Sequence, residues 1–312
     1  MSDPIFCLMG PTASGKTSLA CELVAHFPFE IISVDSAIIY RDMNIGTAKP
    51  TPDILARIPH HLVDILDPPE SYSAALFCEA VAQLIKHMRS RGKIPLLVGG
   101  TMMYFRALQQ GLSALPESDP LIREALLKEA EVHGWQHMHE KLREVDEKSA
   151  SKIHPHDTQR IQRALEVFRI TARPLSEFYE VNKDSSSFRY INLLLMPSIR
   201  ATLHERITLR FDEMLKEGLI DEVQGLLQKW QLTLDHPSMR TVGYRQVLPY
   251  LQGMDDYKTM HDKAVAATRQ LAKRQLTWLR HWPDGFHFMI ENPAVLSEIM
   301  AIIQQILDNP SY

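Results

Sequence analysis

The stretch IFCLMGPTASGKT, residues 5–17, organises the rest of this chain. Its first five residues are all apolar, which is typical of a strand buried on both faces of a parallel sheet. The residues that follow match G-x-x-x-x-G-K-[ST], and an amphipathic helical pattern continues to about Val24. A buried strand, a glycine-rich turn and a helix in this order predict a phosphate-binding loop.

The chemistry of such a loop comes mainly from its backbone. Successive N–H groups form a nest for an anion at the helix N-terminus, and glycines allow the required conformations and close approach. The Lys16 ammonium would supply charge for the terminal phosphates, and the Thr17 hydroxyl suits Mg²⁺. We expect a phosphate-rich small molecule to bind here, through Gly10, Pro11, Thr12, Ala13, Ser14, Gly15, Lys16 and Thr17.

Further apolar runs alternate with helical patterns along the chain. This alternation predicts an α/β fold, with a doubly wound parallel sheet as its core. From about residue 116 the sequence becomes charged and helical, so we expect a P-loop-type core at residues 1–115 and 188–312 and a helical insertion at 116–187. The expected strands are residues 5–9, 31–34, 61–65 (weaker), 94–98, 191–196 and an edge strand at 286–290, with a helix at 74–91.

Composition limits the classes of function. The net charge is −4, so a nucleic-acid surface would require local clustering of Lys and Arg. The three cysteines, Cys7, Cys21 and Cys78, have no zinc-site spacing and predict unpaired thiols in a reducing compartment. The N-terminal apolar run is too short for a signal peptide or a membrane span, so we expect a cytoplasmic protein without membrane contact.

Polar residues follow two of the expected strands at the edge where ligands bind in open α/β sheets. Asp35 and Ser36 follow the second strand, and Thr101 follows the fourth. Asp35 is a candidate general base or Mg²⁺ ligand, and its alternative role is to cap the next segment. The fourth strand ends in Gly-Gly-Thr rather than an acid, which argues against ATP as the ligand.

Three segments concentrate side chains suited to nucleic acid. Residues 159–163 read QRIQR, with Gln159, Gln162 and Arg163 expected to face outward, and residues 240–245 read RTVGYR. A helix at 265–280 carries an acid-free stripe of Arg269, Lys273, Thr277 and Arg280, as expected for a polyanion contact. For the first two segments, an ordinary solvated surface remains an alternative.

The ensemble of motifs resembles the bacterial tRNA dimethylallyltransferase family. The resemblance extends from residue 7 to about residue 282. The segments that carry it are residues 10–17, 35–41, 44–50 (NIGTAKP), 99–101, 159–163, 240–245 and 269–280.

The resemblance implies transfer of a dimethylallyl group from dimethylallyl diphosphate to N6 of adenosine 37, in tRNAs that read codons beginning with U. The loop would hold the diphosphate leaving group with Mg²⁺ bound at Thr17, and Arg210 would assist. Asp35 would accept the N6 proton, and Thr101 would hydrogen-bond the flipped base. The helical insertion would close over the anticodon stem-loop.

The resemblance also implies an extended tRNA surface, and we expect a monomer because nothing in the sequence demands a dimer. A small-molecule P-loop kinase and an RNA-binding protein with a purely structural loop are the alternative hypotheses. The implied tRNA contacts are Asp35, Ser36, Ala37, Ile38, Thr101, Arg123, Gln159, Arg160, Ile161, Gln162, Arg163, Arg240, Thr241, Val242, Gly243, Tyr244, Arg245, Lys273, Arg274, Gln275, Leu276, Thr277, Trp278, Leu279 and Arg280.

Overall fold

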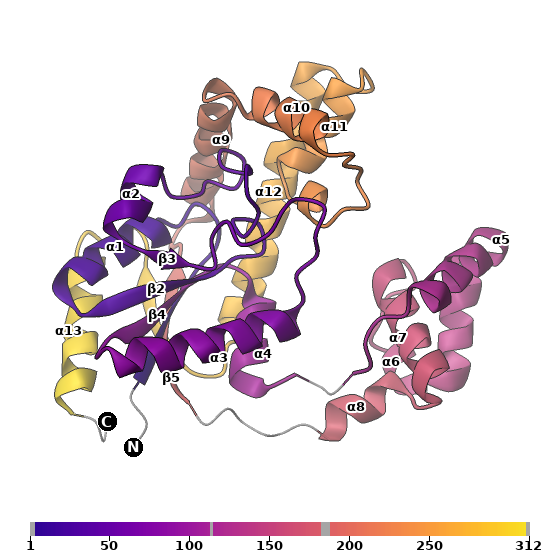
Figure 1. Cartoon of the computed structure of the whole chain (residues 1–312), viewed down its shortest axis with the longest axis horizontal. Helices are drawn as coiled ribbons and strands as arrows, with labels where there is room; N and C mark the ends of the chain where they lie inside the picture. Colours follow the sequence, from indigo (N-terminus) through magenta and orange to yellow (C-terminus); the bar gives the residue numbers. More distant parts are fainter. Residues whose placement is uncertain (1–3, 113–114, 182–187, 310–312) are drawn as a thin grey trace. The chain divides into compact units, whose positions relative to one another are not determined.

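A computed structural model describes residues 4–112, 115–181 and 188–309. The chain divides into two compact units, residues 1–109 with 187–312 and residues 110–186. The first unit holds the sheet, and the second, inserted into its sequence, is helical (Figure 1). The insertion was expected to begin at residue 116, and its expected last residues, 182–187, lie outside the described residues.

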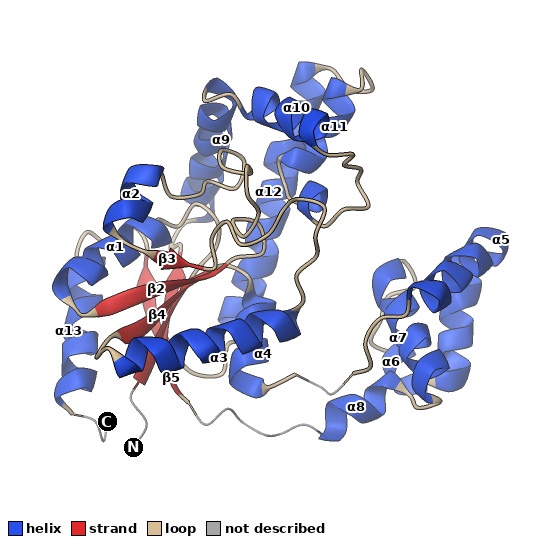
Figure 2. Cartoon of the chain, in the orientation of Figure 1, coloured by secondary structure: helices blue, strands red, loops and turns tan. Residues whose placement is uncertain are grey.

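The first unit is built on a parallel sheet, which confirms the predicted α/β class (Figure 2). Strand β1, with the phosphate loop at its end, lies inside the sheet between β4 and β5. Among the described residues the strands, in spatial order, are β3 (His60–His61), β2 (Phe29–Val34), β4 (Ile94–Gly99), β1 (Pro4–Met9), β5 (Arg189–Met196) and β6 (Phe286–Met289).

The predicted third strand was largely wrong. Only His60 and His61 pair with β2, although the expectation covered residues 61–65. Leu62 and Asp64 have φ angles of 63° and 54°, a left-handed conformation that cannot continue a strand. Beyond these strands, Tyr40 and Leu66 form an isolated parallel bridge between the loops that follow β2 and β3.

Alternate residues of β1 face two different cores, as the pleat of a strand requires. Phe6 and Leu8 pack in one core with α1 (Lys16–His26) and α13 (Val295–Asp308), which come from opposite ends of the sequence. Cys7 faces the other core, formed with α3 (Ala74–Ser90), α4 (Met102–Gln110) and α12 (Tyr257–Arg280). The central strand is therefore covered on both faces, which explains its unbroken apolar sequence.

A further core lies beside the sheet. Buried Ile39, Tyr40 and Met43 pack in it against helices that follow β5. These helices are α9 (Arg200–Lys216), α10 (Leu219–Lys229), α11 (Tyr244–Leu251) and the first half of α12. A short 3-10 turn at Ser238–Arg240 precedes α11. Helix α2 (Pro52–Arg57) lies elsewhere in the unit. The loop after β2 is thus fastened to helices nearly two hundred residues away in sequence.

The insertion has its own apolar core, and from Pro120 to Val181 it consists of helices with short connections between them. Gly134, with φ of 80°, interrupts its long first helix. Asp157 caps the third helix by accepting a hydrogen bond from Arg160 N. Its helices are α5 (Pro120–Val145), α6 (Glu147–Ala150), α7 (Thr158–Thr171) and α8 (Leu175–Val181).

All three cysteines are free, and Cys7 is buried in the sheet. Within the described residues, no helix combines the length and the apolar character that a membrane span requires.

Candidate active site at the carboxyl edge of the sheet

A cavity of about 780 Å³ opens where β1, β2 and β4 end. Its walls include the phosphate loop, Asp35 after β2, Thr101 after β4, and Arg210 from α9. The sequence predicted that the first three would converge because parallel strands end at one edge, and this is confirmed. Arg210 joins them although it lies on a helix far along the chain.

The phosphate loop has the backbone geometry that its sequence predicts. Gly15 adopts φ of 82° immediately before α1, a conformation that glycine reaches without a steric penalty. A Cβ at Gly10 would lie 2.9 Å from the Ser14 Oγ and 3.0 Å from the Leu195 Cβ. Both glycines are therefore required, one for its dihedral angle and the other for close packing.

Lys16 is the loop's positive charge, and its protonation is finely balanced. Its Nζ donates hydrogen bonds to Pro11 O at 2.6 Å and to Ser14 Oγ at 3.4 Å. Burial is the main cause that lowers the pKa of Lys16 to about 7, while the Asp35 carboxylate raises it and Arg210 lowers it further. An anion in the nest would favour the charged form of this lysine.

Gln275 of α12 connects the two glycine-rich turns. Its Oε1 accepts a hydrogen bond from Thr12 N at 2.9 Å, and its Nε2 donates one to Gly100 O at 3.0 Å. A Cβ at Gly100 would lie only 2.4 Å from that Nε2. Gln275 is 8% exposed and lines the cavity, and its amide holds the phosphate loop beside the β4 turn; its contact with tRNA stays a prediction.

Asp35 and Thr101 are positioned through the backbone that follows β2. Asp35 Oδ1 accepts a hydrogen bond from Ala37 N at 2.8 Å, and Thr101 Oγ1 accepts one from Ser36 N at 3.2 Å. Asp35 thus caps the turn, as the alternative role suggested, and also lines the cavity. A capping hydrogen bond to one oxygen fixes the carboxylate's orientation without preventing chemistry at the other.

Arg210 adds a second cation to this wall of the cavity. Burial lowers the pKa of its guanidinium, and the Asp35 carboxylate opposes that shift. An acid and two basic groups, Lys16 and Arg210, therefore act on one another electrostatically around one space. The two cations suit an anionic ligand, and the Asp35 carboxylate beside them can take up a proton.

The segment at 240–245 lies at the cavity, but one of its side chains has a different role from the one expected. Arg240, Thr241, Val242 and Gly243 line the cavity. Tyr244 is fully buried, and its hydroxyl donates a hydrogen bond to Glu222 Oε1 at 2.5 Å. The segment was expected to offer its side chains to nucleic acid, but this ring packs inside the protein.

Helix α12 has an exposed polar face and a buried apolar face, and the boundary between them is sharper than the sequence predicted. Lys273, Arg274, Thr277 and Arg280 are exposed, and Arg274 and Trp278 line the cavity. Leu276 and Leu279 are buried in the core, so direct tRNA contacts by them, implied by the resemblance, are wrong.

Arg269 departs from the exposed stripe on α12. Its Nη2 donates a hydrogen bond to Thr208 Oγ1 of α9 at 3.0 Å. The side chain is only partly exposed. Its predicted role as a free polyanion contact is therefore replaced by a contact between two helices.

In the insertion, the segment 159–163 is also divided. Gln159 and Arg160 are exposed as expected, but Ile161 and Gln162 are buried, and Gln162 donates a hydrogen bond to the backbone at Arg123. The outward orientation predicted for Gln162 is wrong because its amide satisfies a carbonyl of the neighbouring helix α5.

A buried carboxylate explains the orientation of Arg163. Glu166 is fully buried, and its oxygens accept hydrogen bonds from Ser118 Oγ at 2.6 Å, Asp119 N at 2.9 Å and Arg163 Nη1 at 2.8 Å. Arg123 Nε lies 3.8 Å from the same carboxylate. Sequence reasoning missed Glu166, because a single Glu within a helix carries no signal that it is buried.

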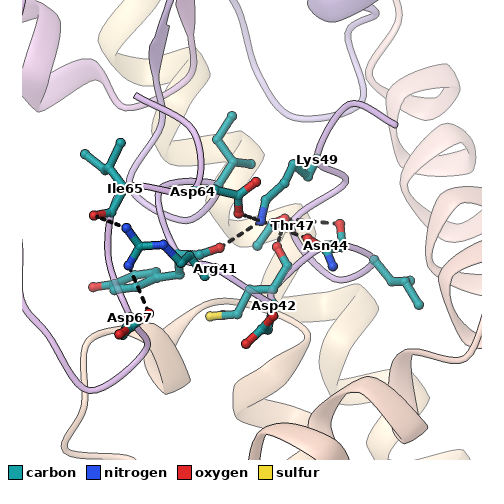
Figure 3. A network of polar contacts seen from close by, with 12 residues as sticks. Arg41, Asp42, Asn44, Thr47, Lys49, Asp64, Ile65 and Asp67 are labelled. Atoms are coloured by element: carbon teal, nitrogen blue, oxygen red, sulfur yellow. Dashed lines mark hydrogen bonds and ion pairs between the residues drawn. The ribbon is translucent and has the colours of Figure 1, made fainter. Parts of the chain in front are cut away.

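Lys49 is a second residue whose role only the structure shows. Its side chain is 3% exposed and its Nζ donates hydrogen bonds to Tyr40 O at 2.8 Å, Asn44 Oδ1 at 2.9 Å and Asp64 Oδ1 at 2.5 Å (Figure 3). This buried ammonium gathers the turns after β2 and β3. Its place in the motif at 44–50 was the only signal in the sequence.

Together, the parallel sheet and the phosphate loop at the end of an inner strand define a P-loop-type α/β protein. A family model described as IPP transferase matches residues 38–282. The chain is 57% identical over 309 residues to a tRNA dimethylallyltransferase of Legionella pneumophila (strain Corby), with 99% of each covered. It is 50% identical over 303 residues to one of Coxiella burnetii (strain Dugway 5J108-111), with 97% of each covered.

Solved structures agree with the sequence comparisons. The tRNA isopentenylpyrophosphate transferase of Bacillus halodurans superposes with a TM-score of 0.71 at 34% identity, covering 99% of this chain and 98% of that one. A eukaryotic dimethylallyltransferase acting on tRNA gives a TM-score of 0.84 at 26% identity, covering 99% and 80%. The chain belongs to the IPP transferase family. It is a transferase of this family rather than a kinase.

Proposed function

We propose that the chain transfers a dimethylallyl group from dimethylallyl diphosphate to N6 of adenosine 37, in tRNAs that read codons beginning with U. The observation that carries the proposal is the shared cavity of the phosphate loop, Asp35, Thr101 and Arg210. This arrangement sets anion-binding groups and a proton acceptor around one space. The family relationship supplies the identity of the group transferred.

On the donor side, the loop would bind the diphosphate through its backbone N–H groups. The Lys16 ammonium and the Arg210 guanidinium would stabilise the negative charge that grows as the bond between the allylic carbon and the diphosphate oxygen breaks. Thr12 N already donates a hydrogen bond to Gln275, so Gln275 fixes the end of this nest. The leaving group would remain as free diphosphate.

On the acceptor side, N6 must reach the allylic carbon, which requires adenosine 37 to leave its stack. Thr101 Oγ1 would hydrogen-bond the flipped base. As the carbon–nitrogen bond forms, Asp35 would take the proton that N6 loses. The products are N6-dimethylallyladenosine and diphosphate, so atoms and charge balance with no further reactant.

Mg²⁺ fits this cavity as part of the same proposal. Thr17 offers a hydroxyl at the cavity wall, an oxygen donor of the type that Mg²⁺ prefers. Among the described residues no cluster of three metal-binding side chains occurs, so most ligands would be diphosphate oxygens and water. When bound, the ion would help to neutralise the charge of the diphosphate.

The tRNA surface extends from the cavity onto exposed basic side chains. Lys273, Arg274 and Arg280 on α12 have the exposure that phosphate contacts require. In the insertion, Gln159, Arg160 and Arg123 are similarly exposed, and we propose that this unit contacts the anticodon stem-loop. A monomer acting in the cytoplasm completes the proposal.

A direct assay tests the function. Protein, Mg²⁺, dimethylallyl diphosphate and unmodified tRNA with the sequence A36-A37-A38 are incubated, and the digested RNA is analysed by mass spectrometry. We expect one dimethylallyl addition at A37 and release of one diphosphate. A parallel reaction with ATP in place of the donor should give no phosphorylated product. Folded protein that leaves A37 unmodified would disprove the proposal.

A further inference from the structure

Residues 44–50 form part of the cavity wall, although none of them has a role in the proposed reaction. Gly46, Thr47, Ala48 and Pro50 line the cavity together with residues 240–243. This segment has no regular secondary structure of its own. The position of this segment therefore depends on contacts with other parts of the protein.

Glu222 of α10 binds the start of this segment through three consecutive backbone amides. Its Oε2 accepts hydrogen bonds from Asn44 N at 2.9 Å and Ile45 N at 2.8 Å, and its Oε1 accepts one from Gly46 N at 3.2 Å. Successive N–H groups around one carboxylate form the same kind of nest that loops offer to phosphate. Here the anion is a protein side chain that holds the loop in place.

Tyr244 of α11 also contacts Glu222 and this segment, and we call the contacts of Glu222 and Tyr244 with residues 44–46 the grip. Its hydroxyl donates to Glu222 Oε1 at 2.5 Å, and a Cβ at Gly46 would lie 2.5 Å from its ring. The loop backbone thus rests against the ring of Tyr244. Because Gly243 and Tyr244 are neighbours, the same contact also determines where residues 240–243 meet the cavity.

Two lysines support the grip on either side. Lys229, at the end of α10, forms an ion pair with Asp42 at 2.6 Å. Buried Lys49 holds Asn44 Oδ1 and Tyr40 O (Figure 3). By contrast, the phosphate loop is held by Gln275 and by its own turn, and within the described residues its hydrogen bonds do not involve this network.

We propose that Glu222 is a positioning residue that, with Tyr244, places the two cavity walls at residues 44–50 and 240–243 for the acceptor RNA. The inference rests on the proposed function. The carboxylate does not act on reacting atoms, and its effect passes through the backbone it binds. Loss of the grip should therefore weaken use of the RNA while leaving the diphosphate donor bound normally.

The test compares two isosteric variants on one helix. E222Q places an amide N–H₂ donor or a single carbonyl where the carboxylate accepts four hydrogen bonds, so the grip is lost with little change in volume. D221N removes the same charge from the adjacent, exposed residue in the first turn of α10. Y244F is a milder variant, since the ring still supports Gly46 without the hydroxyl.

For E222Q we expect KM for an anticodon stem-loop RNA to rise about 10- to 100-fold, as for a misplaced binding group. KM for dimethylallyl diphosphate should change less than about two-fold, since its loop keeps its own contacts. Hydrogen exchange at the amides of residues 44–46 should accelerate in E222Q. Y244F should show the same pattern with a smaller rise, and D221N should match the wild type.

Equal increases in both KM values, unchanged RNA use by E222Q, or the same defect in D221N would each overturn the inference. If E222Q does not fold, the same comparison of KM values is made with Y244F, and an unchanged RNA KM there overturns the inference. The wild-type protein is assayed in parallel. Its failure to modify A37 would refute the proposed function, whereas an active wild type with a normal Glu222 variant refutes only this inference.

Discussion

The phosphate loop and the basic segments at 159–163, 240–245 and 269–280 were predicted from the same sequence with different success. The loop forms between β1 and α1 as the motif predicts, because Gly10 and Gly15 meet its backbone requirements. In the basic segments, Gln162, Tyr244 and Gln275 turn inward to bind distant partners. Local backbone requirements are thus readable from sequence, whereas the orientation of a polar side chain depends on what packs beside it.

The largest effect is expected at Asp35, which the sequence predicted from strand order alone. We expect Asp35→Asn to lower kcat about 10²- to 10⁴-fold, because the amide cannot accept the N6 proton. The affinity for inorganic diphosphate should stay near wild type, measured by calorimetry with Mg²⁺ present. A comparable loss of diphosphate affinity would instead identify Asp35 as a metal ligand.

The buried carboxylate of the insertion should give the next largest effect. Glu166→Ala leaves Ser118, Asp119 N and Arg163 without their acceptor, so we expect a loss of about 3 kcal/mol in the free energy of unfolding of this unit. Hydrogen exchange of residues 115–181 measures it. The matched control is Glu177→Ala, which breaks an exposed pair with Arg173 and should cost less than about 1 kcal/mol. Equal losses would mean that Glu166 is not the organising charge.

Lys16 gives the loop a predicted pH dependence. Its pKa of about 7 means that the free protein carries the charge below pH 7 and loses it above. Bound diphosphate favours the charged form, so affinity for diphosphate should fall about ten-fold per pH unit above the free-state pKa. Calorimetry across this range measures the slope. In Lys16→Arg the side chain stays charged, so any slope that remains there belongs to the ligand, and equal slopes in both proteins would contradict the prediction.

The smallest effects should separate two arginines of α12. We expect Arg280→Ala to weaken tRNA binding a few-fold and to lower the slope of log K against log salt by about 1, as for one lost phosphate contact. Arg269→Ala removes the same charge, but that guanidinium binds Thr208, so the salt slope should remain at the wild-type value. Fluorescence anisotropy with a labelled stem-loop measures both. Identical salt slopes in the two variants would contradict the prediction that Arg280, and not Arg269, contacts phosphate.

Much of the fold could be predicted because its signals are periodic and local. Five of the six expected strands form within one or two residues of their predicted ends, and a helical insertion, expected at residues 116–187, is also present. The prediction of the third strand was wrong because Leu62 and Asp64 adopt left-handed conformations. Neither residue is a glycine, so the sequence carries no signal of this conformation. The site was predictable where strand order determined it, at Asp35 and Thr101, and the roles of its residues in transfer and in tRNA binding stay predictions.

By itself, the sequence determined the phosphate loop, the parallel order of the core and the convergence of Asp35 and Thr101 on that loop. Glycine dihedral angles and the polarity of parallel strands require these features whatever surrounds them. Only the tertiary structure decided that Glu222 binds the backbone at residues 44–46, that Gln275 joins the two turns, and that Glu166 withdraws Arg163 from the surface. Each of these depends on a polar group whose burial requires a partner, and that partner lies far away in sequence or on an unmarked helix face.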